Sequence, residues 1–492
     1  MISGSTRDWP WVVLFSSLEF IFLFLPLVLA ADLLFWRLGL ERLAIVWLLA
    51  ASLFFYCWWD PRYGLLLGAS ILVNYGFGWA LAAPRTRRLS VLWAGIVFNV
   101  GLLAYFKYAN FFVDSLNAAG LSDLHLTAIL LPLGISFFTF QQIAYLVDTW
   151  RGDAHDRNLI RYALFVTFFP HLIAGPLVHH AEMMRQFTAA RRRLMSWDTA
   201  ASGLGIFTVG LFKKVVIADG LSAYSTPVFA AADAGLTVST IEGWIGALAY
   251  TFQLYNDFSG YSDMAIGIAL LFGIRLPLNF LSPYRARSVT EFWRRWHVTL
   301  SRFLRDYLYI PLGGNRRGRA ASYRNLMITM VLGGFWHGAS VTFLVWGALH
   351  GAYLVAERLV RDMRGRDAAP LLPVPLAWFL TFLAVVVGWV FFRAETLQGA
   401  GDIIAGMIGA SGSFASLDNL GAARFEVGEL TILLAVSIAN ALVLPTASEF
   451  FLERRTLVRF TPNAASAIVT LIGWGFIVMS LGGRSEFLYF QF

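Results

Sequence analysis

One segment without Asp, Glu, Lys or Arg, Asn325–Ala356, limits the fold of this chain most strongly. It is too long for a single transmembrane helix of about 20 residues and short for two complete ones. Arginines flank it on both sides, which predicts by the positive-inside rule that both ends face the cytosol. We therefore predict a helical hairpin, broken at Gly333-Gly334 or at Gly338, because irregular backbone is tolerated at membrane depth only inside protein or beside a cavity.

A histidine lies in the middle of this segment. At about 1.5 Å per residue, His337 is about 18 Å along a helix from Asn325, near the centre of a bilayer core about 30 Å thick. An ionisable residue at that depth is a functional-site hypothesis, although a histidine that only bonds a neighbouring helix fits the position equally well. The setting Gly-Gly-Phe-Trp-His-Gly favours the site, because glycine breaks helices and permits close approach of a ligand.

The composition indicates a polytopic membrane protein. Of 492 residues, 58% are hydrophobic and 14% charged. The net charge of +8 comes from arginines in short loops between apolar runs, so it predicts topology and not nucleic-acid binding. The single cysteine, Cys57, excludes a disulfide framework and a thiolate zinc site, and it is a poor candidate nucleophile in an apolar run. The first apolar run lacks the basic leader of a cleavable signal peptide.

Apolar runs predict an all-α membrane protein with about eleven transmembrane helices. The arginines that follow the first and third runs place the N-terminus outside. Pro132 and Gly134 predict a kink within the fifth run, and Gly399–Gly421 predicts a loop with at most one short helix. Besides the hairpin, the predicted spans are Trp11–Trp36, Leu43–Trp59, Tyr63–Leu81, Leu92–Phe106, Leu126–Val147, Gly203–Ala218, Ile241–Tyr255, Leu376–Phe392, Leu430–Leu444 and Ala465–Leu481.

A second segment, Phe165–Val178, also predicts a broken or re-entrant helix, because two prolines and a glycine fall within it. His171 in this segment either lines the same cavity as His337 or bonds a carbonyl group freed by the helix break. His179 and His180 are adjacent and cannot share one helical face, so a metal site there is the less favoured interpretation.

The run Phe292–Tyr307 predicts one interfacial helix, with Arg294, Arg295, Arg302 and Arg305 opposite an apolar face. His297 falls at the edge of the apolar face. The arginines suit the phosphates of CoA or of a phosphopantetheine carrier, although anionic lipid needs no substrate and explains them equally well. Lys213 and Lys214 are expected partly in the interface. Asp257 and Asp263 are predicted to pair with the arginines or, less favoured, to orient a histidine.

Several long motifs in the same order resemble the membrane-bound O-acyltransferase family over most of the chain. The resemblance is closest to the bacterial branch that acetylates alginate, and it extends to the D-alanyl transfer proteins of teichoic acid synthesis. The motifs are FFPHLIAGPLVHHAEM from Phe168, YNDFSGYSDMAIGIALLFGIRLPLNF from Tyr255, FWRRWHVTLSRFLRDYLYIPLGGNRRG from Phe292, GGFWHGAS from Gly333, WGALHG from Trp346, and the terminal EFLYFQF.

The resemblance implies that His337 takes the family's catalytic-histidine position and His297 that of the second histidine. It implies a fold around a central tunnel or funnel, as one membrane domain with N-terminal spans (1–150), a catalytic core (151–366) and C-terminal spans (367–492). His337 would act as the base, and His297 would orient, relay a proton or polarise the thioester carbonyl. Donor or tunnel contacts are expected from Trp336, Trp296, Arg294, Arg295, Asn256, Asp257, His350 and His171.

The resemblance also implies an activity: transfer of acetyl from cytosolic acetyl-CoA across the bacterial inner membrane, for O-acetylation of an exported, alginate-like polysaccharide. No permanently bound cofactor or metal is expected. Periplasmic acetyltransferase partner proteins would pass the group to the polymer, and a carrier-protein thioester is an alternative donor. D-alanyl or peptidoglycan O-acyl transfer remains open. From other classes, a lipid-linked saccharide flippase or transporter predicts inverted repeats, which the chain lacks, and the histidines argue against a non-catalytic scaffold.

Overall fold

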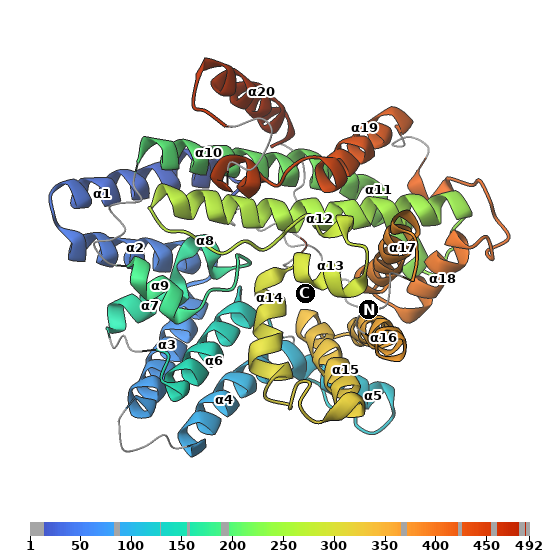
Figure 1. The fold of residues 1–492 in the computed structure, drawn as a ribbon, viewed down its shortest axis with the longest axis horizontal. Helices are drawn as coiled ribbons and strands as arrows, with labels where there is room; N and C mark the ends of the chain where they lie inside the picture. The colour runs from blue at the N-terminus through green and yellow to red at the C-terminus, as the bar shows by residue number, and fades with distance from the viewer. Residues whose placement is uncertain are drawn as a thin grey trace. The chain divides into compact units, whose positions relative to one another are not determined.

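The computed structural model describes residues 14–82, 89–127, 129–154, 158–187, 196–365, 371–421, 426–453, 460–481 and 488. These residues are helical, with no β-strand among them, which confirms the all-α prediction (Figure 1). The chain forms two compact units: residues 1–106, 130–207 and 264–277 make the first, and residues 107–129, 208–263 and 278–492 the second. The division into 1–150, 151–366 and 367–492 stays a prediction.

The helices of the first unit pack through apolar faces and buried amides. Asn74 and Asn99 exchange hydrogen bonds of 2.6 and 3.2 Å, and Gln142 donates to Ser70 Oγ at 2.9 Å. Such polar contacts join helices where no water competes. The helices are α1 Leu25–Arg37, α2 Glu41–Cys57, α3 Pro61–Leu81, α4 Leu89–Leu103, α6 Ile135–Arg151, α7 Leu159–Thr167, α8 Phe169–Leu172 and α9 His180–Gln186, with the π-helical turn Phe20–Phe24 before α1.

Two predictions about this unit have opposite outcomes. The break in Phe165–Val178 is confirmed, because the helix ends at Thr167 and resumes only as the short α8. The kinked span Leu126–Val147 is wrong, because α6 starts only at Ile135. Gly134 is the reason: it has a φ of 68°, and a Cβ there would lie 2.8 Å from the Leu172 carbonyl oxygen. Pro132 and Gly134 therefore precede the helix and do not kink it.

Two helices, α10 Trp197–Phe212 and α12 Thr240–Leu271, contribute residues to both units. The others in the second unit are α5 Ala109–Ala118, α11 Asp219–Asp233, α13 Val289–Arg295, α14 Val298–Leu304, α15 Gly318–His337, α16 Val341–Arg364, α17 Val374–Arg393, α18 Leu397–Met407, α19 Val427–Ile438 and α20 Ala464–Ser480. Short 3₁₀ helices lie at Pro283–Arg285 and Asp418–Leu420, and π-helical turns at Ala104–Tyr108, Lys213–Ala218, Arg305–Tyr309, Ala439–Val443 and Glu449–Glu453.

Several helices run past their predicted ends. Helix α12 is continuous for 32 residues, well beyond Tyr255, and the span predicted to end at Ala218 continues as one apolar helix to Asp233. The charged residues from which the sequence analysis predicted these helix ends form buried ion pairs. Lys213 bonds Asp263 at 2.8 Å, and Lys214 bonds Asp257 at 2.8 Å and Asp219 at 2.6 Å. The prediction that the acids pair with arginines is therefore wrong, and the partly interfacial position of the segment Gly203–Ala218 stays a prediction.

The predicted hairpin is present, and its break is at Gly338. Helices α15 and α16 lie side by side in Figure 1. They are antiparallel: a Cβ on Gly334 would meet the Phe343 carbonyl oxygen at 2.3 Å, and one on Gly347 would meet that of Met330 at 2.5 Å. Glycine at these positions lets the two backbones approach closely, as in tightly packed membrane helices.

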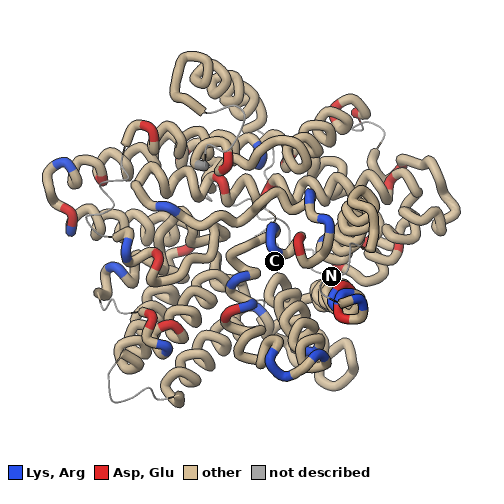
Figure 2. Tube along the Cα trace, in the orientation of Figure 1, with Lys and Arg blue, Asp and Glu red and all other residues tan. Residues whose placement is uncertain are grey.

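Six helical stretches among the described residues are long and apolar enough to cross a membrane: Phe20–Arg37, Pro61–Leu81, Leu89–Ala118, Trp197–Asp233, Val341–Arg364 and Val374–Arg393. Apolar side chains are widely exposed, as on α20, where Met479 is 85% exposed. Figure 2 shows charged residues concentrated near helix ends, among them those of α15 and α16. The chain is thus a multi-pass membrane protein, and the count of about eleven spans stays a prediction. Trp11, the loop arginines Arg85, Arg87 and Arg88, and the tail apart from Leu488 lie outside the described residues.

Candidate active site

His337 ends helix α15 inside an aromatic chamber of the second unit. Its ring centroid lies 4.9 Å from Trp336, 5.2 Å from Trp346 and 5.2 Å from Phe392, and the residue is 5% exposed. The ammonium group of Lys107 donates to the carbonyl oxygens of Trp336, at 2.5 Å, and of His337, at 3.0 Å. A cation at this position satisfies terminal helix carbonyls and the negative end of the helix dipole.

His297 lies in the same chamber, 6.5 Å from His337 between ring centroids. The helix predicted over Phe292–Tyr307 is interrupted here, with α13 ending at Arg295 and α14 beginning at Val298. His297 has φ 42° and ψ 54°, a left-handed conformation that few side chains adopt, and it is fully buried. Such conformations cost about 1–3 kcal/mol and are concentrated at functional sites.

His350 on α16 is the third histidine of this region. Trp346 lies between it and His337, with ring centroids 5.0 Å from His350. The indole Nε1 of Trp293 donates to His350 Nδ1 at 3.3 Å. A Cβ on Gly388 would lie 2.7 Å from His350 Nε2, so α17 closes that side of the ring. The predicted contact of His350 with the donor or tunnel stays a prediction.

Four polar atoms of the chamber are buried without a hydrogen-bond partner among the described residues: Nδ1 of His337, Nε2 of His297, Nε2 of His350 and Nε1 of Trp346. Buried polar atoms in proteins almost always have partners. The atoms of His337 and His297 indicate that a polar ligand or water completes the site between these two rings, whereas Nε2 of His350 faces Gly388 of α17. Within the described part of the chain, no group of three or more metal-ligating side chains occurs.

The arginines predicted to hold donor phosphates are only partly available. Arg294 is exposed, but Arg295 donates to Glu291 at 2.7 Å and to the Leu281 carbonyl at 3.2 Å. Arg305 is bound to Asp306 at 2.6 Å, a bond that raises the pKa of its guanidinium above the ordinary value. The region after Tyr309 has a different arrangement, with Arg316 and Arg317 in the loop and Arg319 in the first turn of α15 all exposed.

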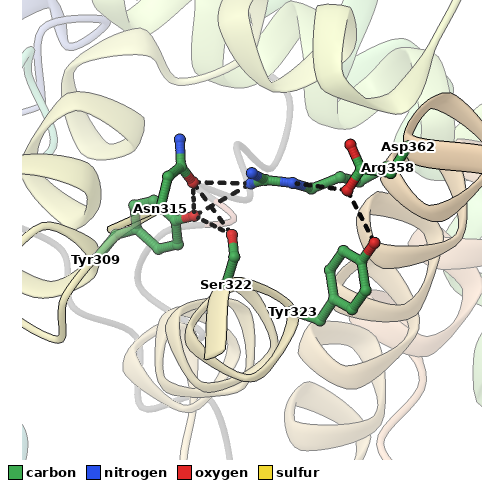
Figure 3. Close-up of polar contacts among 6 residues, drawn as sticks. All are labelled: Tyr309, Asn315, Ser322, Tyr323, Arg358 and Asp362. Atoms are coloured by element: carbon green, nitrogen blue, oxygen red, sulfur yellow. Dashed lines mark hydrogen bonds and ion pairs between the residues drawn. The ribbon is translucent and has the colours of Figure 1, made fainter. Parts of the chain in front are cut away.

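That loop is fixed to the open end of the hairpin by a polar cluster (Figure 3). Arg358 on α16 donates to Asn315 Oδ1 at 2.9 Å and to the Tyr309 hydroxyl at 3.3 Å. Ser322 on α15 donates to the same Asn315 oxygen at 3.1 Å. Tyr323 and Asp362 form a second link between the two helices, at 2.9 Å. The basic loop is therefore held by both arms of the hairpin that carries His337.

The remaining predicted contacts have other surroundings. Trp296 is buried, with its ring 4.7 Å from Trp389. Asn256 accepts from Asn440 at 2.9 Å, and Asp257 pairs with Lys214. Among the described residues, Asn256 and Asp257 are thus bonded to neighbouring helices, and their predicted contact with the donor or tunnel stays a prediction.

The histidines of the first unit have partners of their own. The Gln141 amide donates to His171 Nδ1 at 3.0 Å, so this nitrogen binds a side chain and not a freed carbonyl group, and the alternative that His171 lines a cavity stays a prediction. His179 lies 3.7 Å from Asp148. His180 packs against the rings of Tyr145 and Phe165, at 4.9 and 5.4 Å. None of the three forms a metal site with other described residues.

Sequence reasoning missed three contributors to the chamber: Lys107, Asn279 and Phe392. Asn279 accepts from His297 Nδ1 at 3.0 Å. Lys107 could have been predicted from the sequence, because a lone lysine in an apolar helix needs a partner. It was not considered, because the predicted span ended at Phe106, one residue before it. Asn279 falls in the motif that begins at Tyr255, but nothing in the sequence pairs it with His297, and Phe392 is one of many aromatic residues in an apolar run.

Comparison with known proteins gives the family of the chain. The sequence model of the membrane-bound O-acyltransferase family matches residues 151–387. The chain is 40% identical to the peptidoglycan O-acetyltransferase of Helicobacter pylori over 98% of each protein. It is 42% identical to the probable alginate O-acetylase AlgI of Pseudomonas putida, over 98% of this chain and 100% of that protein. It is 48% identical to the AlgI of Pseudomonas aeruginosa, over 79% and 73%.

The match to the Helicobacter pylori enzyme extends over nearly the whole length of both proteins. It therefore excludes the transporter and scaffold interpretations. The chain belongs to the membrane-bound O-acyltransferase family and is an O-acyltransferase.

Proposed function

We propose that this O-acyltransferase takes acetyl from cytosolic acetyl-CoA and passes it across the bacterial inner membrane for O-acetylation of an exported, alginate-like polysaccharide. The observation that supports it best is the buried pair of histidines, His337 and His297, 6.5 Å apart in an aromatic chamber. The similarity to two alginate O-acetylases supports the choice of acyl group and polymer. No resident cofactor or metal takes part in the reaction.

In the transfer step, His337 removes the proton of an acceptor hydroxyl as the hydroxyl oxygen attacks the thioester carbonyl carbon. The new C–O bond forms, the C–S bond breaks, and the proton passes to the leaving thiolate. The products are an acetyl ester and free CoA. Histidine suits this role because it exchanges protons near neutral pH. A hydroxyl between the two rings would contact a nitrogen of each, given hydrogen bonds of about 2.6–3.2 Å.

The donor enters from the basic end of the hairpin. Arg316, Arg317 and Arg319 are exposed there, and guanidinium groups bind phosphates well. Helix α15 separates this loop from His337 by about 28 Å. We propose that this loop binds the phosphates of incoming CoA first, and that the donor then moves along the hairpin until its thiol arm reaches the chamber. Periplasmic partner proteins then receive the acetyl group and deliver it to the polymer.

Peptidoglycan is the second candidate acceptor. The similar protein from Helicobacter pylori is a peptidoglycan O-acetyltransferase, and the match covers 98% of this chain and 98% of that protein. Both candidates need the same donor chemistry and the same histidines, so they differ only in the partner and polymer.

The proposal is tested with purified protein and acetyl-CoA labelled in the acetyl group. We expect wild-type protein to release CoA and pass the label to an acceptor, and His337→Ala to lose at least about 10²-fold of this rate. D-alanyl and acetyl carrier-protein thioesters are assayed in parallel. If the protein used a carrier-protein thioester and did not use acetyl-CoA, the carrier-protein thioester would be the donor. Equal turnover by wild type and His337→Ala would refute the role of His337.

A further inference from the structure

Asn279 is the centre of a buried hydrogen-bond network around His297. It lies in the irregular segment between α12 and α13 and is 1% exposed. Its Oδ1 accepts from His297 Nδ1 at 3.0 Å and from Thr299 Oγ1 at 2.9 Å. Its Nδ2 donates to Ser262 Oγ on α12 at 3.2 Å. Every polar atom of this side chain therefore has a partner.

The network determines which way the amide points. The backbone N–H of Thr299 also faces Oδ1, at 3.4 Å, and an N–H group can only donate. If the Asn279 amide were turned around, its NH₂ group would face the Thr299 N–H, and two donors cannot form a hydrogen bond. The amide oxygen must therefore face His297 and Thr299. Because this oxygen can only accept, Nδ1 of His297 must carry the hydrogen. In a neutral imidazole the other nitrogen, Nε2, then has the free lone pair.

Asn279 also fixes the backbone around His297. Its main-chain carbonyl accepts from the Val298 N–H at 3.0 Å. The residue thus binds the chain on the C-terminal side of His297 through both its backbone and its side chain. These bonds help to hold His297 in its left-handed conformation, φ 42°.

We infer that Asn279 is a positioning residue that keeps the proton on Nδ1 of His297 and so makes Nε2 a proton acceptor. This inference rests on the proposed acyl transfer at the histidine pair. It selects among the three roles left open for His297: a neutral ring with a bare Nε2 accepts or relays a proton, and it cannot polarise a thioester carbonyl by donating a hydrogen bond.

His350 provides an internal contrast. Its Nδ1 accepts from Trp293 Nε1, and an indole N–H can only donate. His350 therefore carries its hydrogen on Nε2, the opposite tautomer. Two histidines in one chamber are fixed in opposite states by different neighbours, and His297 alone of these two has Nε2 available as an acceptor.

The tautomer is measured without any donor or acceptor. Protein labelled with ¹⁵N-histidine is embedded in lipid bilayers for solid-state NMR, and the signals lost in His297→Asn identify His297. We expect a protonated Nδ1 and an unprotonated Nε2 in wild type, and a change toward the other tautomer in Asn279→Leu. A protonated Nε2 in wild type would overturn the inference, whether or not acetyl-CoA is the donor.

Kinetics test the consequence. Asn279→Leu removes the acceptor at similar size, and we expect kcat for acetyl-CoA turnover to fall about 10²-fold, with KM changed by no more than about twofold. Asn279→Asp keeps the acceptor oxygen and restores most of kcat. Asn99→Ala, which removes a buried amide of the first unit, is the stability control and keeps kcat.

The pH profile separates positioning from simple loss of structure. The groups that face His297 are Asn279, Thr299, Phe258, Trp336 and His337, and of these only His337 titrates. A carboxylate in Asn279→Asp stabilises protonated His297, so activity should decline at a higher pH on the acid side than in wild type. The positioning role would be overturned if Asn279→Leu had the kcat and the pH profile of wild type while His297→Asn was inactive. An inactive wild type would instead refute the proposed function.

Discussion

At the scale of single residues, the backbone of His297 has a direct consequence for substitution. Its φ of 42° suits glycine and, among other residues, asparagine. We expect His297→Asn to keep the wild-type thermal stability while transfer falls at least about 10²-fold, because asparagine accepts this conformation but is no base. The measurements are thermal unfolding in detergent and the initial rate of thioester turnover.

His297→Val is the matched comparison. A β-branched residue is strained at positive φ, so we expect it to unfold at lower temperature, with a loss of about 1–2 kcal/mol. Equal stability of the Asn and Val variants would mean that the left-handed conformation is absent from the purified protein.

The residues themselves were predicted unevenly. His337, His297 and His350 were identified because they fall in motifs. In the structure, Trp346 contacts His337 and His350, and His297 lies 6.5 Å from His337. Asn279 was not identified, because its role depends on four partners spread over three segments. Asp257 was expected to pair with arginines, because an acid in an apolar helix calls for a partner. The lysine that pairs with Asp257 precedes it by more than forty positions, so only the folded chain shows the pairing.

At the scale of elements, the packing of the hairpin is sensitive to single methyl groups. A Cβ on Gly334 would lie 2.3 Å from the Phe343 carbonyl oxygen, which belongs to the backbone and cannot rotate away. We expect Gly334→Ala to destabilise the protein by about 1–3 kcal/mol, seen as a lower Tm and reduced activity. At the neighbouring Gly333, the nearest atom is the side-chain Cδ1 of Leu304, at 3.1 Å. Gly333→Ala should be tolerated, and equal Tm values for the two variants would contradict the packing.

The buried ion pairs join two helices of the second unit. Lys213 and Asp263 lie 2.8 Å apart, with side chains 6% and 13% exposed. Removing one partner leaves an uncompensated charge in an apolar surrounding, so Lys213→Met should cost about 3–5 kcal/mol. The double variant Lys213→Met with Asp263→Leu should regain most of this loss. Stability is measured by thermal unfolding. If the double variant is no more stable than Lys213→Met, the uncompensated charge is not the cause of the lost stability.

Helix existence was more predictable than helix ends. The hairpin and the spans Leu43–Trp59, Tyr63–Leu81, Leu376–Phe392, Leu430–Leu444 and Ala465–Leu481 correspond closely to helices, because long apolar runs leave few alternatives. The ends failed where polar residues were assumed to mark a boundary. Lys213 and Lys214 continue a helix because acids neutralise them. His297 interrupts one despite a regular amphipathic pattern, because tertiary bonds overcome local preference.

At the scale of the whole molecule, the hairpin makes a prediction about topology. Its antiparallel arms place the loop at Arg317 and the end of α16 at Arg361 on one side of the membrane. In a Cys57→Ser background, cysteines at these two positions should react with an impermeant maleimide in inside-out vesicles and not in spheroplasts. Labelling of the two cysteines from opposite faces would contradict the hairpin.

The central claim is that the chamber around His337 performs acyl transfer to an exported polymer. It is tested most directly in a bacterium lacking its own copy of this protein, complemented with wild type, His337→Ala or the Asn99→Ala control at equal membrane levels. The measurement is the O-acetyl content of the exported polysaccharide. We predict that wild type and Asn99→Ala restore acetylation and that His337→Ala leaves the polymer unacetylated. Restoration by His337→Ala to the wild-type level would contradict the account.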